Sequence, residues 1–357
     1  MSRTRKTATV NAMTRMSYWF GRGLAALAVA LTPASATLLA ASGAVPPNPP
    51  VGAEAWNDDP RRLPDPVTTD PAAIQRFFAG LNPTTQRELA STYPGVVGNL
   101  DGAPIELRYA ANRTTAERNE QILLYDPRGD GEVAQVFGDL TTAQRIAVLV
   151  PGAGNRLGNF WLGVGGKAFR SPAHQGADLY RTAQTYGAHH LAVIVWLGYD
   201  APDGINVASA REDLARAGAA ALERFVAGLT AICPQATLAL LGYSYGSTVI
   251  GLAARHLPAA VTDIAAFGSP GMGVDTVAGL HTTARVWAGL SGRDPMRFVP
   301  GVKIFGLGHG RQPADPAFGA TTFPTRDVVD HDHYLAVGTD SQASLTRIAL
   351  FGSEVQP

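Results

Sequence analysis

The sequence predicts an α/β fold with a mostly parallel eight-stranded sheet and helices on both faces. Short, continuous apolar runs recur between residues 121 and 308, and helix-like stretches separate most of them. Strands buried on both faces read as continuous apolar runs, whereas strands with one wet face alternate between apolar and polar residues. The recurrence of apolar strand and helix therefore indicates a parallel sheet covered by helices on both sides.

The expected elements follow the chain in a consistent order. Asp70 and Pro71 are typical of a helix cap and first turn, so a helix is expected over 70–81, and a second over 83–93. Two strands, "QILLY" and "EVAQVF", flank the turn "DPRGDG" and predict a hairpin. The other strands are expected at 145–152, 191–196, 237–242, 263–268, 284–289 and 302–308, and the other helices at 175–186, 209–231, 245–257 and 341–351. Two antiparallel strands followed by six mostly parallel strands is the order of the α/β-hydrolase fold. Only residues 269–283 separate two of the strands, too few for a large cap domain.

The composition favours a globular protein with a sizeable core. The chain has 357 residues, of which 46% are hydrophobic and 16% charged. Lys+Arg and Asp+Glu balance at 29 each, so no net field favours a nucleic-acid partner. We expect a signal or anchor over 1–45, a Pro-rich linker over 46–69 and an α/β-hydrolase domain over 70–357, with an N-terminal helical extension at 70–120.

The N-terminus predicts export. Basic residues and no acidic ones occupy positions 1–53, and the uncharged stretch 23–45 follows the basic start. A basic start, an apolar run and small-residue sites such as Ala34-Ser35-Ala36 are typical of a signal peptide. The run is also long enough to be retained as a membrane anchor. Either interpretation predicts a secreted or cell-envelope protein, associated with the membrane or envelope through its N-terminus.

The stretch "LLGYSYGS" contains Ser244 between Gly242 and Gly246, directly after an apolar strand and before a helix. A sharp strand–serine–helix turn strains the serine backbone and needs small residues on either side. Such a turn places the hydroxyl above the carboxyl edge of the sheet. Ser244 is therefore the predicted nucleophile.

A serine nucleophile needs a base and an orienting acid, and both must come from the carboxyl edge of the sheet. His189, His190, His256 and His281 lie at the wrong edge in the predicted order, which leaves four candidates: His174, His309, His331 and His333. Asp294, just after the strand 284–289, is the leading acid, and Asp275, one strand earlier, is the alternative.

The intermediate of acyl transfer needs two backbone N–H donors. Tyr245, next to the nucleophile, supplies one. The glycine-rich loop "PGAG" supplies the other, from Ala153 or alternatively Gly152. His331 and His333 have too few neighbouring ligand residues for a metal site, and no cofactor motif is present, so we expect neither a metal nor a cofactor.

The chain resembles the uncharacterised, mainly actinobacterial α/β-hydrolase family catalogued as domain of unknown function 1023, also called α/β-hydrolase family 8. The matching segments span about residues 72–352 and include "VVGNLDGAPIELRYAANR", "LVPGAG", "WLGYDAP", "LLGYSYGSTVIG", "FGSPGMGV", "GRQPADPAFGA" and "HDHYLAVG". The resemblance implies Ser244 as nucleophile, Asp294 as acid and His331 as base, in a His-x-x-Tyr pattern with Tyr334. His333 departs from the family pattern and stays the alternative base.

These features predict an exported serine hydrolase that cleaves a small-molecule or lipid-like acyl ester, as carboxylesterases and lipases do. An acyltransferase or a peptidase would use the same triad, and a non-catalytic binding module could share the fold. The three enzymes differ in what attacks the acyl group and what leaves it. A binding module differs from all of them in having no reactive serine.

Overall fold

The computed structural model describes residues 49–304 and 306–352. The segment interpreted as an export signal or anchor, residues 1–45, lies outside these ranges. Within them, no helix combines the length and the apolar composition that crossing a membrane requires.

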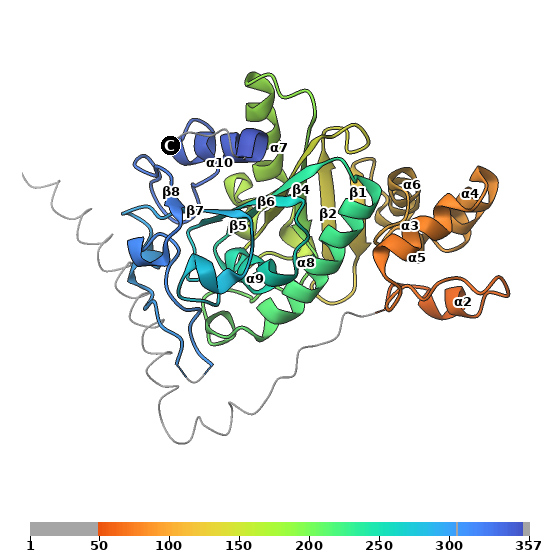
Figure 1. Cartoon of the computed structure of the whole chain (residues 1–357), viewed down its shortest axis with the longest axis horizontal. Coiled ribbons are helices and arrows are strands. Elements are labelled where there is room, and N and C mark those ends of the chain that lie inside the picture. Colours follow the sequence, from red (N-terminus) through yellow and green to blue (C-terminus); the bar gives the residue numbers. More distant parts are fainter. Residues whose placement is uncertain (1–48, 305, 353–357) are drawn as a thin grey trace, which may run out of the picture.

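An eight-stranded sheet forms the centre of the fold, with its strands in the order β1-β2-β4-β3-β5-β6-β7-β8 (Figure 1). β1 pairs antiparallel with β2 and β2 antiparallel with β4, and the other neighbours pair in parallel. The expected mostly parallel eight-stranded sheet is therefore confirmed. The strands are β1 (Gln121–Asp126), β2 (Glu132–Phe137), β3 (Arg145–Val150), β4 (Leu191–Leu197), β5 (Thr237–Tyr243), β6 (Val261–Phe267), β7 (Arg285–Gly289) and β8 (Thr321–Thr322).

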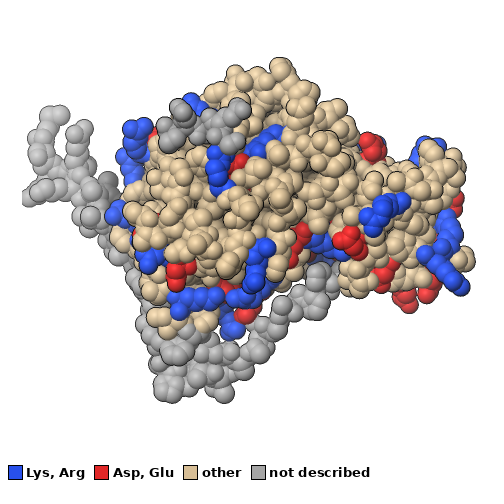
Figure 2. Space-filling view, in the orientation of Figure 1, with Lys and Arg blue, Asp and Glu red and all other residues tan. Residues whose placement is uncertain are grey.

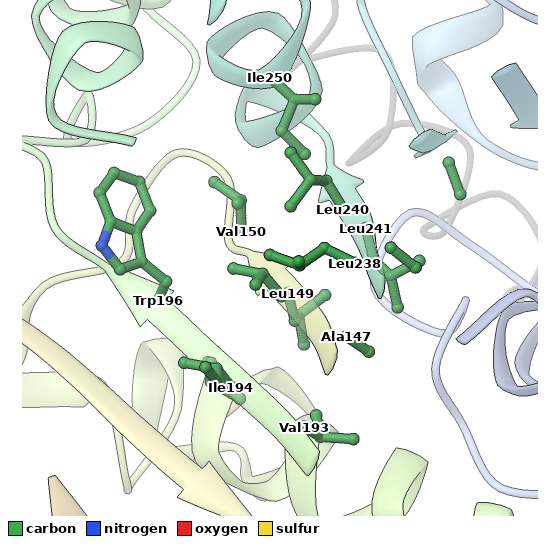
Figure 3. Close-up of a cluster of buried hydrophobic side chains, with 14 of the residues drawn as sticks. Ala147, Leu149, Val150, Val193, Ile194, Trp196, Leu238, Leu240, Leu241 and Ile250 are labelled. Atoms are coloured by element: carbon green, nitrogen blue, oxygen red, sulfur yellow. The ribbon is translucent and has the colours of Figure 1, made fainter. Parts of the chain in front are cut away.

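Helices cover both faces of this sheet. Helices α7 (Pro172–Thr185) and α10 (Asp340–Phe351) lie on one face, and α8 (Asp213–Ile232) and α9 (Tyr245–Ala253) lie on the other (Figure 1). Side chains of β3, β4 and β5 pack together with Ile250 of α9 in the resulting core (Figure 3). Because these strands are buried on both faces, their sequences are apolar at nearly every position.

The connection between β6 and β7 is short, as expected. Residues 268–284 contain one 3₁₀ turn, η7 (Val277–Leu280), and no inserted domain. A large cap over the carboxyl edge is therefore absent from this connection.

The eighth strand differs from the expected one. Residues 302–308 were expected to form it, but the described ones among them make only an isolated bridge between Ile304 and Leu307. The side chains of Val302 and Ile304 are about half exposed. The sheet is completed instead by the polar pair Thr321–Thr322, which bonds to β7. Apolar content indicated a buried strand here, whereas the segment is a surface turn.

The N-terminal extension forms a second, smaller core beside the sheet (Figure 1). Its helices are α3 (Pro71–Ala79), α4 (Pro83–Thr92), α5 (Pro94–Val97) and α6 (Ile105–Ala116). The carboxylate of Asp70 accepts hydrogen bonds from Ala72 N and Ala73 N, which confirms the predicted cap of α3. Helix α3 packs against α8 and so joins the extension to the main domain.

The segment expected as a Pro-rich linker without a core is partly folded. It contains helix α2 (Ala53–Asn57), and Trp56 is fully buried among residues of the extension. The Trp56 indole donates to the Pro64 carbonyl at 2.7 Å, and its ring packs edge-on against Tyr93. The expectation is therefore wrong for this stretch, because one aromatic anchor outweighs the polar, Pro-rich composition around it.

Asp263, near the start of β6, is a buried carboxylate that joins several elements. The guanidinium groups of Arg145 on β3 and Arg285 on β7 each lie 2.7 Å from one of its oxygens, and Trp287 Nε1 donates at 3.0 Å. Arg145 also donates to the Ile348 carbonyl at the end of α10. Burial alone would raise the pKa of Asp263, but hydrogen bonds from Arg145, Trp287 and Thr262 outweigh it and lower that pKa.

Asp263→Asn should lower the free energy of unfolding at pH 7 by roughly 3 kcal/mol, because two guanidinium groups lose a buried partner. Since the folded-state pKa is below the unfolded value, this contribution is complete above about pH 4 and is lost as the pH falls through the folded pKa. The free energy of unfolding should therefore depend less on pH in the variant than in the parent, between about pH 5 and pH 2. Urea unfolding of parent and variant at pH 7 and between about pH 5 and pH 2 measures both the loss and its pH dependence. Asp203→Asn is the control, since that side chain is 76% exposed; equal losses in both variants would contradict the assignment.

Candidate active site

Ser244 lies in the sharp turn between β5 and α9. Its backbone has φ 51° and ψ −124°, a region that residues other than glycine rarely adopt. Ser244 N donates to the Phe267 carbonyl at 2.9 Å, and the Ser247 hydroxyl donates to the Ser244 carbonyl at 2.5 Å. These bonds hold the strained residue at the carboxyl end of β5, where the sequence predicts a nucleophile.

The two glycines of the motif are required by close packing around Ser244. A Cβ atom at Gly242 would lie 2.6 Å from Ser247 Cα. At Gly246 it would lie 2.6 Å from the Pro151 carbonyl oxygen and closer still to that of Val150. The helix after Ser244 can therefore approach β3 only if position 246 has no side chain.

Gly246→Ala should lower the free energy of unfolding by about 1–3 kcal/mol, because rigid backbone atoms must move to admit the methyl group. Chemical denaturation measures the change. Gly158→Ala is the matched control, since a Cβ atom there would meet nothing within 4 Å. Equal stability of the two variants would show that the turn between β5 and α9 adapts to a side chain at position 246.

His331 lies between Ser244 and Asp294. Its Nε2 is 3.0 Å from Ser244 Oγ, and its Nδ1 is 3.0 and 2.9 Å from the two carboxylate oxygens of Asp294. An ionised carboxylate only accepts hydrogen bonds, so Nδ1 carries the proton and Nε2 is free to accept one from Ser244. The chain order Ser…Asp…His is thus matched by a continuous hydrogen-bonded path.

Asp294 is fully buried and accepts several hydrogen bonds. Besides His331, Met296 N donates to Oδ1 at 2.8 Å and the Tyr334 hydroxyl donates to Oδ2 at 2.7 Å. Burial alone would raise the pKa of Asp294, but its bonds with His331, Tyr334 and Met296 N outweigh burial and lower that pKa. Asp294 therefore stays ionised beside the imidazole, and it also caps the 3₁₀ turn η8 (Pro295–Phe298).

Two tyrosines hold the acid and the histidine in place, and the sequence patterns assign a role to neither. The Tyr334 hydroxyl donates to Asp294 and accepts from Ser291 N at 2.9 Å. The Tyr243 hydroxyl donates to the His331 carbonyl at 2.8 Å, and the two rings lie 5.1 Å apart. Their positions gave a partial signal, since Tyr243 precedes the serine and Tyr334 completes the His-x-x-Tyr pattern.

Tyr245 and the loop that carries Gly152 and Ala153 lie beside Ser244. Tyr245 N–H is the first of helix α9, so no carbonyl of that helix can accept from it. The loop after β3, the strand that pairs with β5, also reaches the serine. A Cβ atom at Gly152 in this loop would lie 2.7 Å from Ser244 Cβ and 3.2 Å from Tyr245 N. Ala153 follows Gly152 directly in that loop, so its N–H stays the predicted second donor and that of Gly152 the alternative.

Hydrogen bonds fix the loop that carries Ala153. The Tyr199 hydroxyl donates to the Pro151 carbonyl at 2.7 Å, and Asn155 Nδ2 donates to the Gly152 carbonyl at 2.9 Å. A loop held in this way needs little reorganisation when charge develops on a bound substrate.

The alternative base, His333, is directed elsewhere. Its Nδ1 lies 2.5 Å from Asp330 Oδ1, and its ring stacks on Phe169 at 4.5 Å. Of the other histidines at the carboxyl edge, His309 is buried with Nε2 2.8 Å from the Ser209 carbonyl, and burial lowers the pKa of His309. His174 is exposed on α7.

The alternative acid, Asp275, also lies outside the hydrogen-bonded path. Its carboxylate accepts the backbone N–H of Arg311 at 3.0 Å. In the described part of the chain, no group of three or more His, Cys, Asp or Glu side chains is arranged to hold a metal ion. The residues that meet at Ser244 can therefore supply a nucleophile, a base, an acid and backbone donors.

Comparison with solved structures finds proteins with low sequence identity. One is a Xanthomonas campestris a/b serine hydrolase without a lid, at 14% identity and a TM-score of 0.39, covering 66% of this chain and 95% of that one. Another is the esterase PE8, at 17% identity and a TM-score of 0.38, covering 60% of this chain and 95% of that one.

Comparison with curated proteins finds mycobacterial relatives. Uncharacterized protein Rv2079 of Mycobacterium tuberculosis is 26% identical over 383 residues, covering 82% of this chain and 57% of that protein. Uncharacterized protein Rv0963c of the same species is 32% identical over 171 residues, covering 46% of this chain and 63% of that protein. The chain thus spans less than two thirds of the length of these relatives. A family model described as alpha/beta hydrolase matches residues 126–304, half of the chain, and includes Ser244 and Asp294.

Proposed function

The chain belongs to the alpha/beta hydrolase family, and we propose that it is a serine hydrolase that cleaves an ester-type acyl bond through an acyl-enzyme. One observation carries the proposal. His331 lies within hydrogen-bond distance of both Ser244 Oγ and the buried Asp294 carboxylate. A strained serine, a correctly oriented imidazole and an ionised acid together are the requirements of nucleophilic acyl transfer.

In the first half-reaction, Ser244 Oγ attacks the acyl carbonyl carbon while His331 Nε2 takes the hydroxyl proton. The carbonyl oxygen becomes an oxyanion, which the N–H groups of Tyr245 and Ala153 would stabilise. As the intermediate collapses, Nε2 gives its proton to the leaving alkoxide, which departs as an alcohol. In the second half, Nε2 activates a water that releases the acid and restores Ser244. The Asp294 carboxylate stabilises the imidazolium in both halves.

Labelling with a fluorophosphonate tests the proposal, because this probe bonds only to an activated serine. We expect mass spectrometry to find one adduct on the Ser244 peptide and none in Ser244→Ala. A non-catalytic binding module would give no adduct at Ser244, which would overturn the proposal. Turnover of a short p-nitrophenyl ester, compared with its anilide and with added alcohol, then separates an esterase from a peptidase and an acyltransferase.

We also propose an extracytoplasmic location, motivated by the basic and uncharged stretches at the N-terminus. Expressed in an actinobacterial host, the protein should begin between about residues 36 and 46 in its exported form. Terminal peptide sequencing checks the site. Recovery of an intact 23–45 segment in the membrane fraction would favour the anchor, and recovery only from the cytoplasm would contradict export.

A further inference from the structure

Large apolar side chains that are exposed to solvent gather on one side of the molecule. The described residues include thirteen of them, and nine lie on four loops, 151–171, 198–212, 290–320 and 323–339. These loops hold only about a quarter of the described residues, so the clustering exceeds an even spread. The nine are Leu162, Phe169, Ile205, Val207, Phe298, Val302, Ile304, Val329 and Val337.

All four loops lie at the carboxyl edge of the sheet, around Ser244. They follow β3, β4, β7 and β8, and this edge also carries the serine turn after β5. Contacts join neighbouring loops: Gly154 N donates to the Pro202 carbonyl at 2.6 Å, and Gly308 N donates to the Ala210 carbonyl at 2.8 Å. The exposed residues therefore form a rim around the candidate active site, which we call the apolar rim.

The most exposed side chains of the apolar rim come from all four loops. Leu162, Ile205, Phe298 and Val337 are 61–75% exposed, and each comes from a different loop. Exposed apolar side chains on several sides of an opening can each insert into a fluid apolar layer.

A basic side chain lies near each of the two aromatic rings of the apolar rim. The Arg297 guanidinium lies 5.1 Å from the Phe298 ring centre, and Lys167 Nζ lies 5.8 Å from that of Phe169. Such pairs allow a ring to enter an apolar layer while the charge stays among head groups. The four loops carry nine Lys and Arg against eight Asp and Glu. Of the acidic residues, Asp294 and Glu212 are buried, and Glu212 pairs with Lys303, so neither sign of charge dominates the rim strongly. Over the face that Figure 2 shows, basic and acidic side chains lie near one another, and most of the surface is uncharged. This balance favours zwitterionic or uncharged head groups over anionic ones.

We propose that the apolar rim docks the protein on a lipid surface with zwitterionic or uncharged head groups, so that the active site faces that surface. This step rests on the proposed function, since an enzyme that cleaves acyl esters needs its opening turned toward them. A protein partner or a second copy seated on the rim would cover Ser244. A lipid surface would instead present ester groups to it, which makes lipid the occupant that agrees with the site.

Binding to phosphatidylcholine vesicles tests the rim in the Ser244→Ala protein, so that catalysis plays no part. The triple variant Leu162→Ser, Ile205→Ser, Phe298→Ser should lower the partition coefficient in a sedimentation assay at least tenfold. The matched control carries serine at three exposed apolar positions away from the rim: Val67, Tyr186 and Phe351. It should bind within twofold of the parent, and equal binding by both triple variants would overturn the proposal.

A second measurement identifies the docking face whatever else in the chain binds lipid. A polarity-sensitive dye is attached at Ile205→Cys or at Val67→Cys; the only native cysteine, Cys233, is buried. We expect vesicles to shift the emission at position 205 to shorter wavelength and to leave position 67 unchanged. A shift at both positions, at neither, or at 205 without vesicles as protein concentration rises would contradict lipid docking; the last would indicate self-association. Fluorophosphonate labelling of the protein with Ser244 intact reports separately on the proposed function.

Discussion

Replacing His331 by alanine is expected to lower kcat for a short ester about 10⁴-fold or more, with the fold intact. His331 Nε2 lies 3.0 Å from Ser244 Oγ, and no other imidazole in the described chain makes that contact. Without it, the hydroxyl keeps its proton and remains a weak nucleophile. Steady-state kinetics measures the loss, and circular dichroism checks the fold.

The double variant with Ser244→Ala gives a sharper result. When residues act as one unit, removing a second member lowers turnover little further. The double variant should therefore be about as slow as either single variant. His333→Ala is the matched control. Its ring stacks on Phe169 and bonds to Asp330, so we expect a loss of about tenfold at most. If His333→Ala loses turnover as completely as Ser244→Ala while His331→Ala stays active, the assignment of the base is wrong.

The sequence was sufficient to predict most strands of the sheet because the central strands are buried on both faces. β3, β4 and β5 are apolar at nearly every position, so their places in the chain followed from composition alone. Once the strand order was known, topology also indicated which side chains reach the carboxyl edge. Ser244, Asp294 and His331 meet there because each lies in the turn or loop that follows the carboxyl end of a strand.

The errors occur where burial and composition disagree. The apolar stretch at 302–308 is a surface turn, and the two threonines of β8 pair with β7 although they are polar. A strand of two residues leaves no periodicity to detect. Trp56 is the opposite case, because a buried ring lies within a stretch whose proline and charge indicate a linker.

The residues that support the site were also beyond local pattern. Tyr334 reaches Asp294 across 40 positions, and Tyr243 reaches the carbonyl of His331 across 88. Nothing in the neighbouring sequence specifies such a partner, since it depends on two loops meeting at the edge. Gly268 is similar: a Cβ atom there would lie 3.1 Å from His331 Cε1, so the residue is small because of the site above it.

Asp294→Asn is expected to lower kcat about 10³–10⁴-fold while KM changes little. The amide keeps the shape of the carboxylate, so its oxygen can still accept from Tyr334. Its NH₂ group would then face His331 Nδ1, which must become the acceptor. The imidazole proton would move to Nε2, and Nε2 could no longer take the proton of Ser244. The loss therefore comes from the wrong tautomer rather than from a displaced ring.

Two companion variants separate this effect from general disturbance. Asp275→Asn should retain most of the parent's turnover, because Asp275 accepts only the Arg311 N–H in the described structure. Tyr334→Phe removes a donor to Asp294 but keeps the carboxylate and the tautomer, so its kcat should fall only about tenfold, as for a positioning residue. Steady-state kinetics of the three proteins should thus rank Asp275→Asn fastest, Tyr334→Phe intermediate and Asp294→Asn slowest. If Asp294→Asn is as active as Asp275→Asn, the bond between Nδ1 and the carboxylate does not orient the base, and the acid must be sought on another strand.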